Sequence, residues 1–156
     1  MTKIIYSIVI IFFNFNAQLY SIDTPLNLIV KDISYGEGNS LSAKGSKLLS
    51  VNYTGWVFDS KAKTKDHCQA KGEIFDSNIL DKFNHKKPFQ FVLGSGVVIK
   101  GWDMGLQNMK INDVRCLVIP PILAYGNRKL GNILKANSTL IFEVKLLDII
   151  SLDNEE

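Results

Sequence analysis

Apolar and polar residues alternate along several short stretches of this chain, which is typical of half-buried β-strands. The alternation is clearest in Leu49–Thr54, Phe89–Leu93 and Leu140–Leu147. Two further stretches, Leu28–Ser34 and Val114–Ile119, are rich in β-branched residues. Successive residues of a strand point to opposite faces of a sheet, so each stretch can bury one side. Together with a short apolar patch near residues 74–76, the pattern predicts about five or six strands.

The stretch Val97–Met109 changes its apolar period partway along, from a continuous β-branched run to helical spacing. Three large residues recur at that spacing: Trp102, Leu106 and Met109. They predict a short helix over about Lys100–Asn108 that buries this face. Periodicity alone favours Trp102 as part of the core rather than of a binding surface. Gly101 and Gly105 lower helix propensity, but they allow another backbone or a ligand to come close.

One clear helix and a set of alternating strands indicate an α+β domain with the helix laid on an antiparallel sheet. The length of 156 residues suggests a single domain. A content of 46% hydrophobic and 21% charged residues is that of a globular protein. The net charge of +3 is too small to imply a nucleic-acid partner. Because the chain carries no metal-binding or nucleotide-binding motif, we expect neither a metal nor a cofactor.

The first 21 residues resemble a secretory signal peptide. Lys3 precedes an apolar segment of about ten residues, and the small residues Ala17 and Ser21 follow it. That segment is too short to cross a bilayer as a helix. We therefore expect a signal peptide over 1–21, a folded domain over 22–156, and a location in the endoplasmic reticulum lumen or outside the cell. A buried first strand or an uncleaved anchor is the alternative.

A secretory route would allow Cys68 and Cys116 to form a disulfide. Two cysteines permit only one pairing, but the sequence does not give the geometry that a bridge needs. Two free thiols are therefore equally compatible with the sequence. Asn52 and Asn137 each begin an N-x-[ST] sequon. Both adjoin predicted strands, so neither needs to be glycosylated.

Six short motifs follow one another along the chain: Tyr53-Thr54-Gly55, Phe75-Asp76-Ser77, Pro88-Phe89-Gln90-Phe91, Val98-Ile99-Lys100-Gly101-Trp102, Ala124-Tyr125-Gly126 and Thr139-Leu140-Ile141-Phe142-Glu143-Val144. Each motif alone is weak evidence. Together, in this order and spacing, they resemble the FKBP family of peptidyl-prolyl cis-trans isomerases, the immunophilins that bind rapamycin-type macrolides. The resemblance extends from about Lys31 to Ile149.

The resemblance implies a five-stranded antiparallel sheet wrapped over one short helix, with Trp102 as the floor of a ligand cleft. It implies that the catalytic set is Asp76, Ile99, Trp102 and Tyr125. It further implies that substrate or macrolide contacts Tyr53, Phe75, Phe89, Val98, Phe142, and Ile133 and Leu134 on a flap over the cleft. The Tyr125 hydroxyl and the Ile99 backbone N–H would donate hydrogen bonds to carbonyls beside the proline.

The implied reaction needs neither a nucleophile nor a metal. Rotation about an amide costs about 18–20 kcal/mol because it breaks the partial double bond, and X–Pro isomerisation is therefore slow. A cleft poor in water that fits the twisted amide better than the planar forms lowers this barrier. The implied partners are proline-containing peptides, folding client proteins and rapamycin-type macrolides as inhibitors. A compact domain without a coiled coil suggests a monomer.

The sequence departs from the family pattern in three places. The loops before Phe75 and after Asp76 are longer than in small members, and both are expected to border the cleft. An arginine that often accompanies the family aspartate is absent from the second loop, which instead contains Lys82, His85, Lys86 and Lys87. Both histidines of the chain lie in polar loops and are expected to be solvated.

The third departure is in the flap, where Leu134-Lys135-Ala136 contains no proline. The altered flap and loops leave a second hypothesis open, a weakly catalytic or non-catalytic immunophilin that binds peptides or a partner. An extracellular effector is a third hypothesis.

Overall fold

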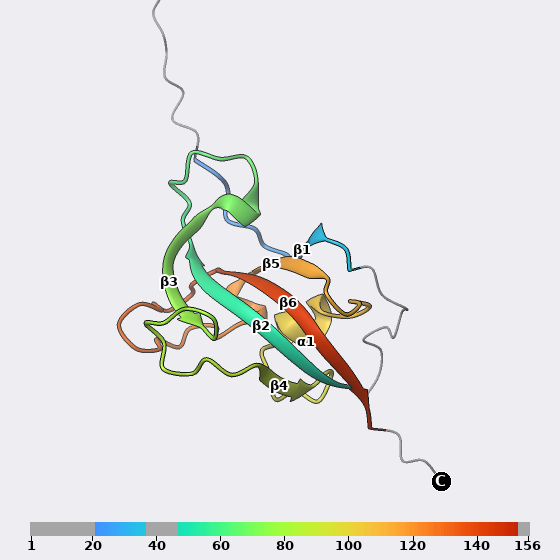
Figure 1. The fold of residues 1–156 in the computed structure, drawn as a ribbon. Helices are drawn as coiled ribbons and strands as arrows, with labels where there is room; N and C mark the ends of the chain where they lie inside the picture. The colour runs from blue at the N-terminus through green and yellow to red at the C-terminus, as the bar shows by residue number, and fades with distance from the viewer. Residues whose placement is uncertain (1–20, 37–46, 153–156) are drawn as a thin grey trace, which may run out of the picture.

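The computed structural model describes residues 21–36 and 47–152, and it has one short helix against a strongly curved antiparallel sheet (Figure 1). In chain order the elements are β1 (Ile29–Ser34), β2 (Lys47–Phe58), the 3-10 helix η1 (His67–Gln69), β3 (Lys71–Ser77), β4 (Phe89–Val92), α1 (Lys100–Gly105), β5 (Val114–Ile119), η2 (Pro121–Leu123) and β6 (Leu140–Ser151). The predicted α+β architecture is confirmed.

The strand order of the sheet is β1-β5-β6-β2-β3, and β4 also pairs with β2. At 12 residues, β2 is about 40 Å long, which leaves room for two short strands along one edge. Its first half, Leu48–Val51, pairs with β4, and its second half, Thr54–Phe58, pairs with β3. The six strands of the described sheet therefore occupy five positions. This arrangement agrees with the predicted five-stranded sheet.

The sequence showed β3 only as a short apolar patch, because this strand does not alternate cleanly. Its pairing with β2 shifts register twice, around Trp56. Such irregularities break the period of two on which strand prediction depends. The helix is also shorter than predicted, ending at Gly105 rather than Asn108. Asn108 has a positive φ of 62°, which a continuing right-handed helix does not allow.

The concave face of the sheet holds the main core, and α1 packs against β5 there. A Cβ at Gly101 would lie 2.4 Å from the Ile119 side chain, and one at Gly105 would lie 2.6 Å from the Leu117 side chain. The two glycines therefore allow the helix to approach the sheet closely. As predicted, Trp102, Leu106 and Met109 are all buried in this core.

The convex face carries a second, smaller apolar cluster: Ile22, Cys68, Ala70, Cys116, Val118 and Ile141. The long connection between β2 and β3 turns through η1 and covers this face, so it does not border the cleft as expected. A disulfide joins Cys68 to Cys116 of β5, with the two Cα atoms 6.2 Å apart. Both cysteines are almost completely buried. The insertion is thus attached to the outside of the sheet by apolar contacts and one covalent bond.

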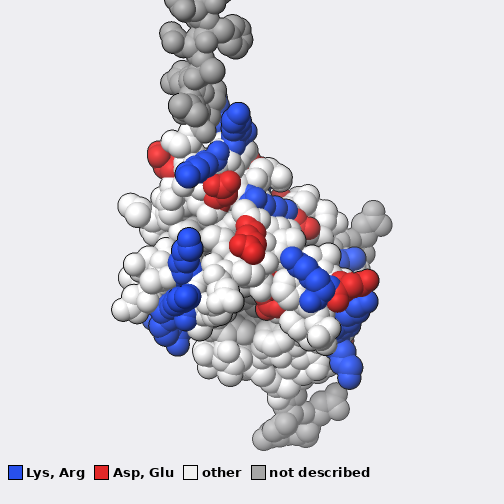
Figure 2. Space-filling view, turned by 90° about the vertical axis from the view of Figure 1, so that its left-hand side faces the viewer, with Lys and Arg blue, Asp and Glu red and all other residues white. Residues whose placement is uncertain are grey.

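Apart from Ser21, the predicted signal peptide lies outside the described residues. Within residues 21–36 and 47–152, no helix is long and apolar enough to cross a bilayer. The same residues contain no group of three or more His, Cys, Asp or Glu side chains arranged to hold a metal ion. On the face shown in Figure 2, positive and negative side chains are interspersed.

Candidate active site

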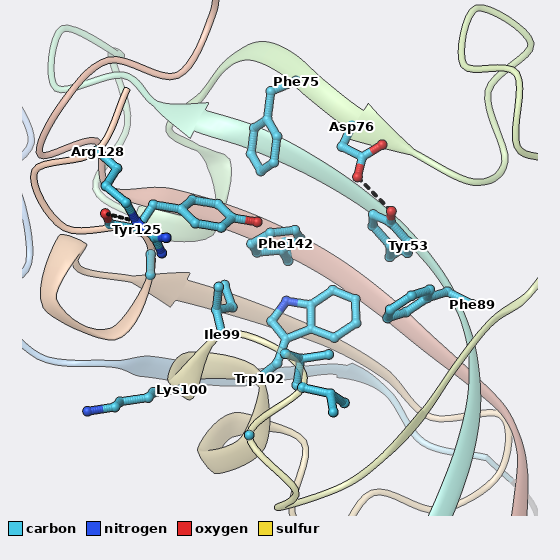
Figure 3. Close-up of a pocket in the computed structure, with 14 residues that line it drawn as sticks. Tyr53, Phe75, Asp76, Phe89, Ile99, Lys100, Trp102, Tyr125, Arg128 and Phe142 are labelled. Carbon is cyan, nitrogen blue, oxygen red and sulfur yellow. Dashed lines mark hydrogen bonds between the residues drawn. The ribbon is translucent and has the colours of Figure 1, made fainter. Parts of the chain in front are cut away.

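A cleft of about 540 Å³ opens on the concave side of the sheet, above α1 (Figure 3). Its volume lies in the usual range for a small-ligand site. Nine of the residues implied by the sequence motifs line it: Tyr53, Phe75, Asp76, Phe89, Val98, Ile99, Trp102, Tyr125 and Phe142. These residues come from β2, β3, β4, α1, β6 and the connections between them, so the fold brings together positions that are far apart in the sequence.

Trp102 forms the floor of this cleft. It is only 4% exposed, and its ring meets Tyr53 and Phe142 edge-to-face at centroid distances of 5.3 and 5.2 Å. Edge-to-face contacts are a favoured arrangement for aromatic pairs. Phe89 and Phe75 extend the aromatic wall on either side (Figure 3). Trp102 is therefore both a core residue, as its periodicity predicts, and a lining residue of the cleft, where the resemblance places it.

The loop before α1 is held in place by a carboxylate of the helix. Asp103 accepts hydrogen bonds from the backbone N–H groups of Gly94 and Gly96, at 2.8 and 3.0 Å. Both glycines have positive φ angles, of 79° and 74°, which other residues rarely adopt. This turn presents the segment that ends in Ile99 along the rim of the cleft.

Three hydrogen-bond donors at the cleft have no partner within the described part of the chain: the buried Trp102 Nε1–H of the floor and two donors at the walls. One wall donor is the backbone N–H of Ile99, and the other is the hydroxyl of Tyr125. Burial is the main cause that raises the pKa of Tyr125, and the charge of Asp76 adds to it. The phenol therefore keeps its proton near neutral pH and can donate it. Both wall donors are available to carbonyl groups of a bound chain.

Asp76 has hydrogen bonds at both of its carboxylate oxygens. Oδ2 accepts from the Tyr53 hydroxyl at 2.6 Å, and Oδ1 accepts from the Ser77 backbone N–H at 2.9 Å. The Nε2 atom of His85 lies 3.0 Å from Oδ1. Burial, the hydrogen bond to Asp76 and its charge together raise the pKa of Tyr53. Asp76 therefore orients Tyr53 within the cleft wall. His85 is exposed, as expected of a loop histidine, and it also contacts this carboxylate, which the sequence did not indicate.

The sequence was compared with known proteins to test whether this cleft belongs to a recognised class. The profile of the family described as FKBP-type peptidyl-prolyl cis-trans isomerase matches residues 39–147. The chain belongs to the FKBP family. The family predicted from the six motifs is thereby confirmed, and its members are rotamases.

Several curated FKBP relatives are similar to most of this chain. FK506-binding protein 1A of Neurospora crassa is 48% identical over 114 residues, which cover 73% of this chain and 81% of that protein. FK506-binding protein 1 of Aspergillus oryzae is 42% identical over 119 residues, or 76% of this chain and 95% of that protein.

Longer relatives match over only part of their length. Peptidyl-prolyl cis-trans isomerase FKBP53 of Arabidopsis thaliana is 41% identical over 125 residues, 80% of this chain but 23% of that protein. FK506-binding protein 2B of Rhizopus delemar is 41% identical over 121 residues, which are 50% of its length. The chain thus spans a quarter to a half of these relatives.

Two residues assigned to the flap do not line the FKBP cleft. Leu134 is 6% exposed and belongs to the concave core, while Ile133 lines a separate hollow beside Val57 and Phe58. The backbone N–H of Leu130 bonds to the Leu134 carbonyl at 3.0 Å, closing a tight turn that directs Leu134 inward. The prediction that both residues cover the cleft is therefore corrected.

Sequence reasoning also missed residues that do line the FKBP cleft, among them Lys100 and Arg128. Lys100 is the first residue of the predicted helix, and Arg128 follows Tyr125 by three positions. Neither position carries a signal that distinguishes a cleft residue from a solvated one. These two residues reach the cleft only because the fold places the start of the helix opposite the connection that follows Tyr125.

Proposed function

We propose that this protein accelerates cis–trans isomerisation of X–Pro bonds by binding the twisted amide in the aromatic cleft. The planar amide is polar because its lone pair is delocalised onto oxygen, and rotation removes that delocalisation. When the peptide enters a water-poor aromatic site, its amide loses less hydration free energy in the twisted form than in either planar form. The difference in binding between these states is what lowers the barrier.

The protein's own residues divide this task. The proline ring packs on Trp102, with Tyr53 and Phe142 against the floor and Phe89 at the edge. The Ile99 N–H and the Tyr125 hydroxyl bind the carbonyls on either side of the reacting bond. Asp76 keeps Tyr53 in position through its short hydrogen bond. The X–Pro bond then rotates while the carbonyls on both sides of it are held by hydrogen bonds. The peptide is therefore already oriented before it crosses the barrier.

The observation that carries this proposal is the pair of unpartnered donors above an apolar floor. Ile99 and Tyr125 are only half-buried and their donors have no partner among the described residues, so both donors stay open to a bound chain. Both donors border the cleft that Trp102 floors. Their arrangement fits an extended peptide whose carbonyls lie at fixed separation.

The clients we propose are proline-containing proteins that fold in the secretory pathway, with the protein acting as a monomer. Support comes from the apolar segment at the N-terminus and from the buried disulfide, which is typical of oxidising compartments. Rapamycin-type macrolides are proposed as inhibitors that occupy the same cleft. Several relatives are named FK506-binding proteins.

The test is acceleration of isomerisation in a short X–Pro peptide, measured by NMR exchange with and without a rapamycin-type macrolide. We expect acceleration that the macrolide blocks. Tyr125→Phe should lower kcat/KM about 2- to 12-fold, since one hydrogen bond contributes about 0.5–1.5 kcal/mol. Tyr35→Phe is the matched control, because Tyr35 is 79% exposed and lies outside the cleft. Macrolide binding without acceleration would instead identify a peptide-binding module.

A further inference from the structure

The cleft has two ends of different electrostatic character. Asp76 and Tyr53 lie on one side, whereas Arg128 and Lys100 lie across from them, on the side of Tyr125 (Figure 3). Arg128 and Lys100 come from segments 28 positions apart in the sequence, and the fold brings both to the same end of the cleft.

The Asp76 carboxylate at one end of the cleft already has hydrogen-bond partners within the protein. Its oxygens accept hydrogen bonds from Tyr53 and Ser77 and contact His85. A substrate cation at that end would compete with these partners. The chain thus offers little to a basic side chain in the cleft.

The charges at the opposite end have no such partners. Neither Arg128 nor Lys100 forms an ion pair with any residue in 21–36 or 47–152. Among the described residues, the Arg128 side chain makes one hydrogen bond, a long one of 3.4 Å from Nε to the Tyr125 carbonyl. Lys100 lines the same cleft, and its side chain extends outward from the helix start, away from Trp102 (Figure 3). Two exposed cations therefore lie at the end of the cleft where a bound chain would leave on this side.

The field of Arg128 reaches the residue that binds the peptide. Its positive charge lowers the pKa of Tyr125, against the larger effects of burial and Asp76. A group that acts on the Tyr125 hydroxyl also acts on a peptide bound to that hydroxyl. The cationic end is thus close enough to influence substrate choice, although solvent screens it.

We propose that Arg128 and Lys100 form a specificity subsite for an acidic side chain, so that the enzyme prefers X–Pro segments with Asp or Glu within about two residues of the proline. The proposal rests on the proposed function of the cleft. Its physical basis is charge complementarity at a rim with two cations that form no ion pair among the described residues, whereas the carboxylate of Asp76, across the cleft, already has hydrogen-bond partners. Partly exposed pairs of this kind change affinity about two- to fivefold.

The experiment compares peptides that differ only by Glu or Gln at each of the two positions before and after the proline. In the wild-type protein, kcat/KM for one Glu peptide should exceed that for its Gln partner about two- to fivefold at low salt. The ratio should shrink toward one at about 0.5 M salt, because mobile ions screen exposed charges. Arg128→Gln combined with Lys100→Gln should abolish the preference.

Charge reversal supplies the sharper test. Arg128→Glu should disfavour the Glu peptide and favour a Lys peptide at the same position. Lys129→Gln is the matched control, since Lys129 is an exposed neighbour that does not line the cleft. This control should keep the wild-type ratio. A wild-type ratio near one at every position overturns the proposal, and so does a ratio that survives the double substitution.

Failure of the proposed function gives a different result. If no peptide is isomerised faster, the Glu-to-Gln comparison is made on peptide dissociation constants measured by tryptophan fluorescence. A Glu preference in binding that Arg128→Glu reverses would support the subsite without catalysis. Normal acceleration of the Gln peptide with no Glu preference would retain the enzyme and reject the subsite. Absence of both catalysis and binding would reject both.

Discussion

The two faces of the sheet are built by different means. On the concave face, sixteen buried apolar residues form one core that ends in an open aromatic cleft. On the convex face, six buried residues form a cluster that the β2–β3 insertion covers and a disulfide fastens. β5 and β6 serve both faces, because alternate residues point to opposite sides. Leu117 and Ile119 thus belong to the first cluster, and Cys116 and Val118 to the second.

This contrast separates the part of the molecule that binds from the part that holds the fold together. The cleft face leaves polar donors without partners and apolar rings open to solvent, which costs stability. The convex face is closed, and its cross-link restricts the unfolded chain. If this division is correct, substitutions on the two faces should have separable effects on ligand binding and on unfolding.

The largest difference between effects on ligand binding and effects on stability is expected from substitutions of the two tryptophans. Trp102→Ala should lower the free energy of unfolding by about 3–5 kcal/mol and abolish macrolide binding, because it removes the cleft floor. Trp56→Ala is the matched control on the convex face, where the Lys71 ammonium lies 4.2 Å from the ring centroid. It should lose stability but bind macrolide normally. Calorimetric titration and urea unfolding measure the two effects, and unchanged macrolide affinity in Trp102→Ala would refute the site.

The next largest effect is expected from removing the bridge. Cys68→Ala with Cys116→Ala should cost about 2–4 kcal/mol, since the bond closes a loop with a sequence separation of 48. Macrolide affinity should be preserved, because neither residue lines the cleft. Urea unfolding of wild type and variant measures the difference. Two reactive thiols in the denatured wild-type protein would show that no bridge had formed.

A smaller effect is expected from Tyr53→Phe on the concave face. Loss of the hydrogen bond to Asp76 should cost about 1.5 kcal/mol and weaken peptide binding. Since the folded state raises the pKa of Tyr53, it retains a proton that the unfolded chain releases near pH 10. Wild-type stability should therefore fall as pH rises above about 10, and more steeply than in the variant. Thermal unfolding at several pH values would test this, with Tyr35→Phe as control.

The smallest effect is expected from the ion pair of Lys31 and Asp66 on the convex side. The hydrogen bond from Lys31 is the main cause that lowers the pKa of Asp66. A carboxyl group whose pKa is lower in the folded state stabilises the fold at pH values above its pKa in the unfolded chain. This contribution is lost as the pH falls through its pKa in the folded protein. Lys31→Met should thus cost less than about 1 kcal/mol at pH 7 and nothing in strong acid. An equal cost at both pH values would contradict this account.

Sequence reasoning predicted the concave face better than the convex one. The cleft walls come from regular strands and from short motifs, and each motif carries a residue type that the binding chemistry requires. Trp102 shows the limit of periodicity, which correctly placed it in the core. Only the family resemblance indicated that it also lines a cleft.

Other features required the three-dimensional structure, for identifiable physical reasons. β3 was underestimated because its bulged pairing with β2 breaks the alternation. The inward direction of Leu134 follows from a tight local turn, and the contact of His85 with Asp76 follows from the path of a polar loop. The choice between a disulfide and two thiols required the spatial approach of Cys68 to β5.

The disulfide also encloses much of the cleft within a covalent ring. Phe75, Asp76, Phe89, Ile99 and Trp102 all lie between Cys68 and Cys116 in the sequence. Residues 81–87, most of them exposed, form part of the connection after Asp76 and are accessible to a protease. A single cut there would leave two polypeptides still joined through sulfur, with strand pairing to hold them in register. The protein can therefore be cut beside its binding site and remain one covalent unit for as long as the disulfide is intact.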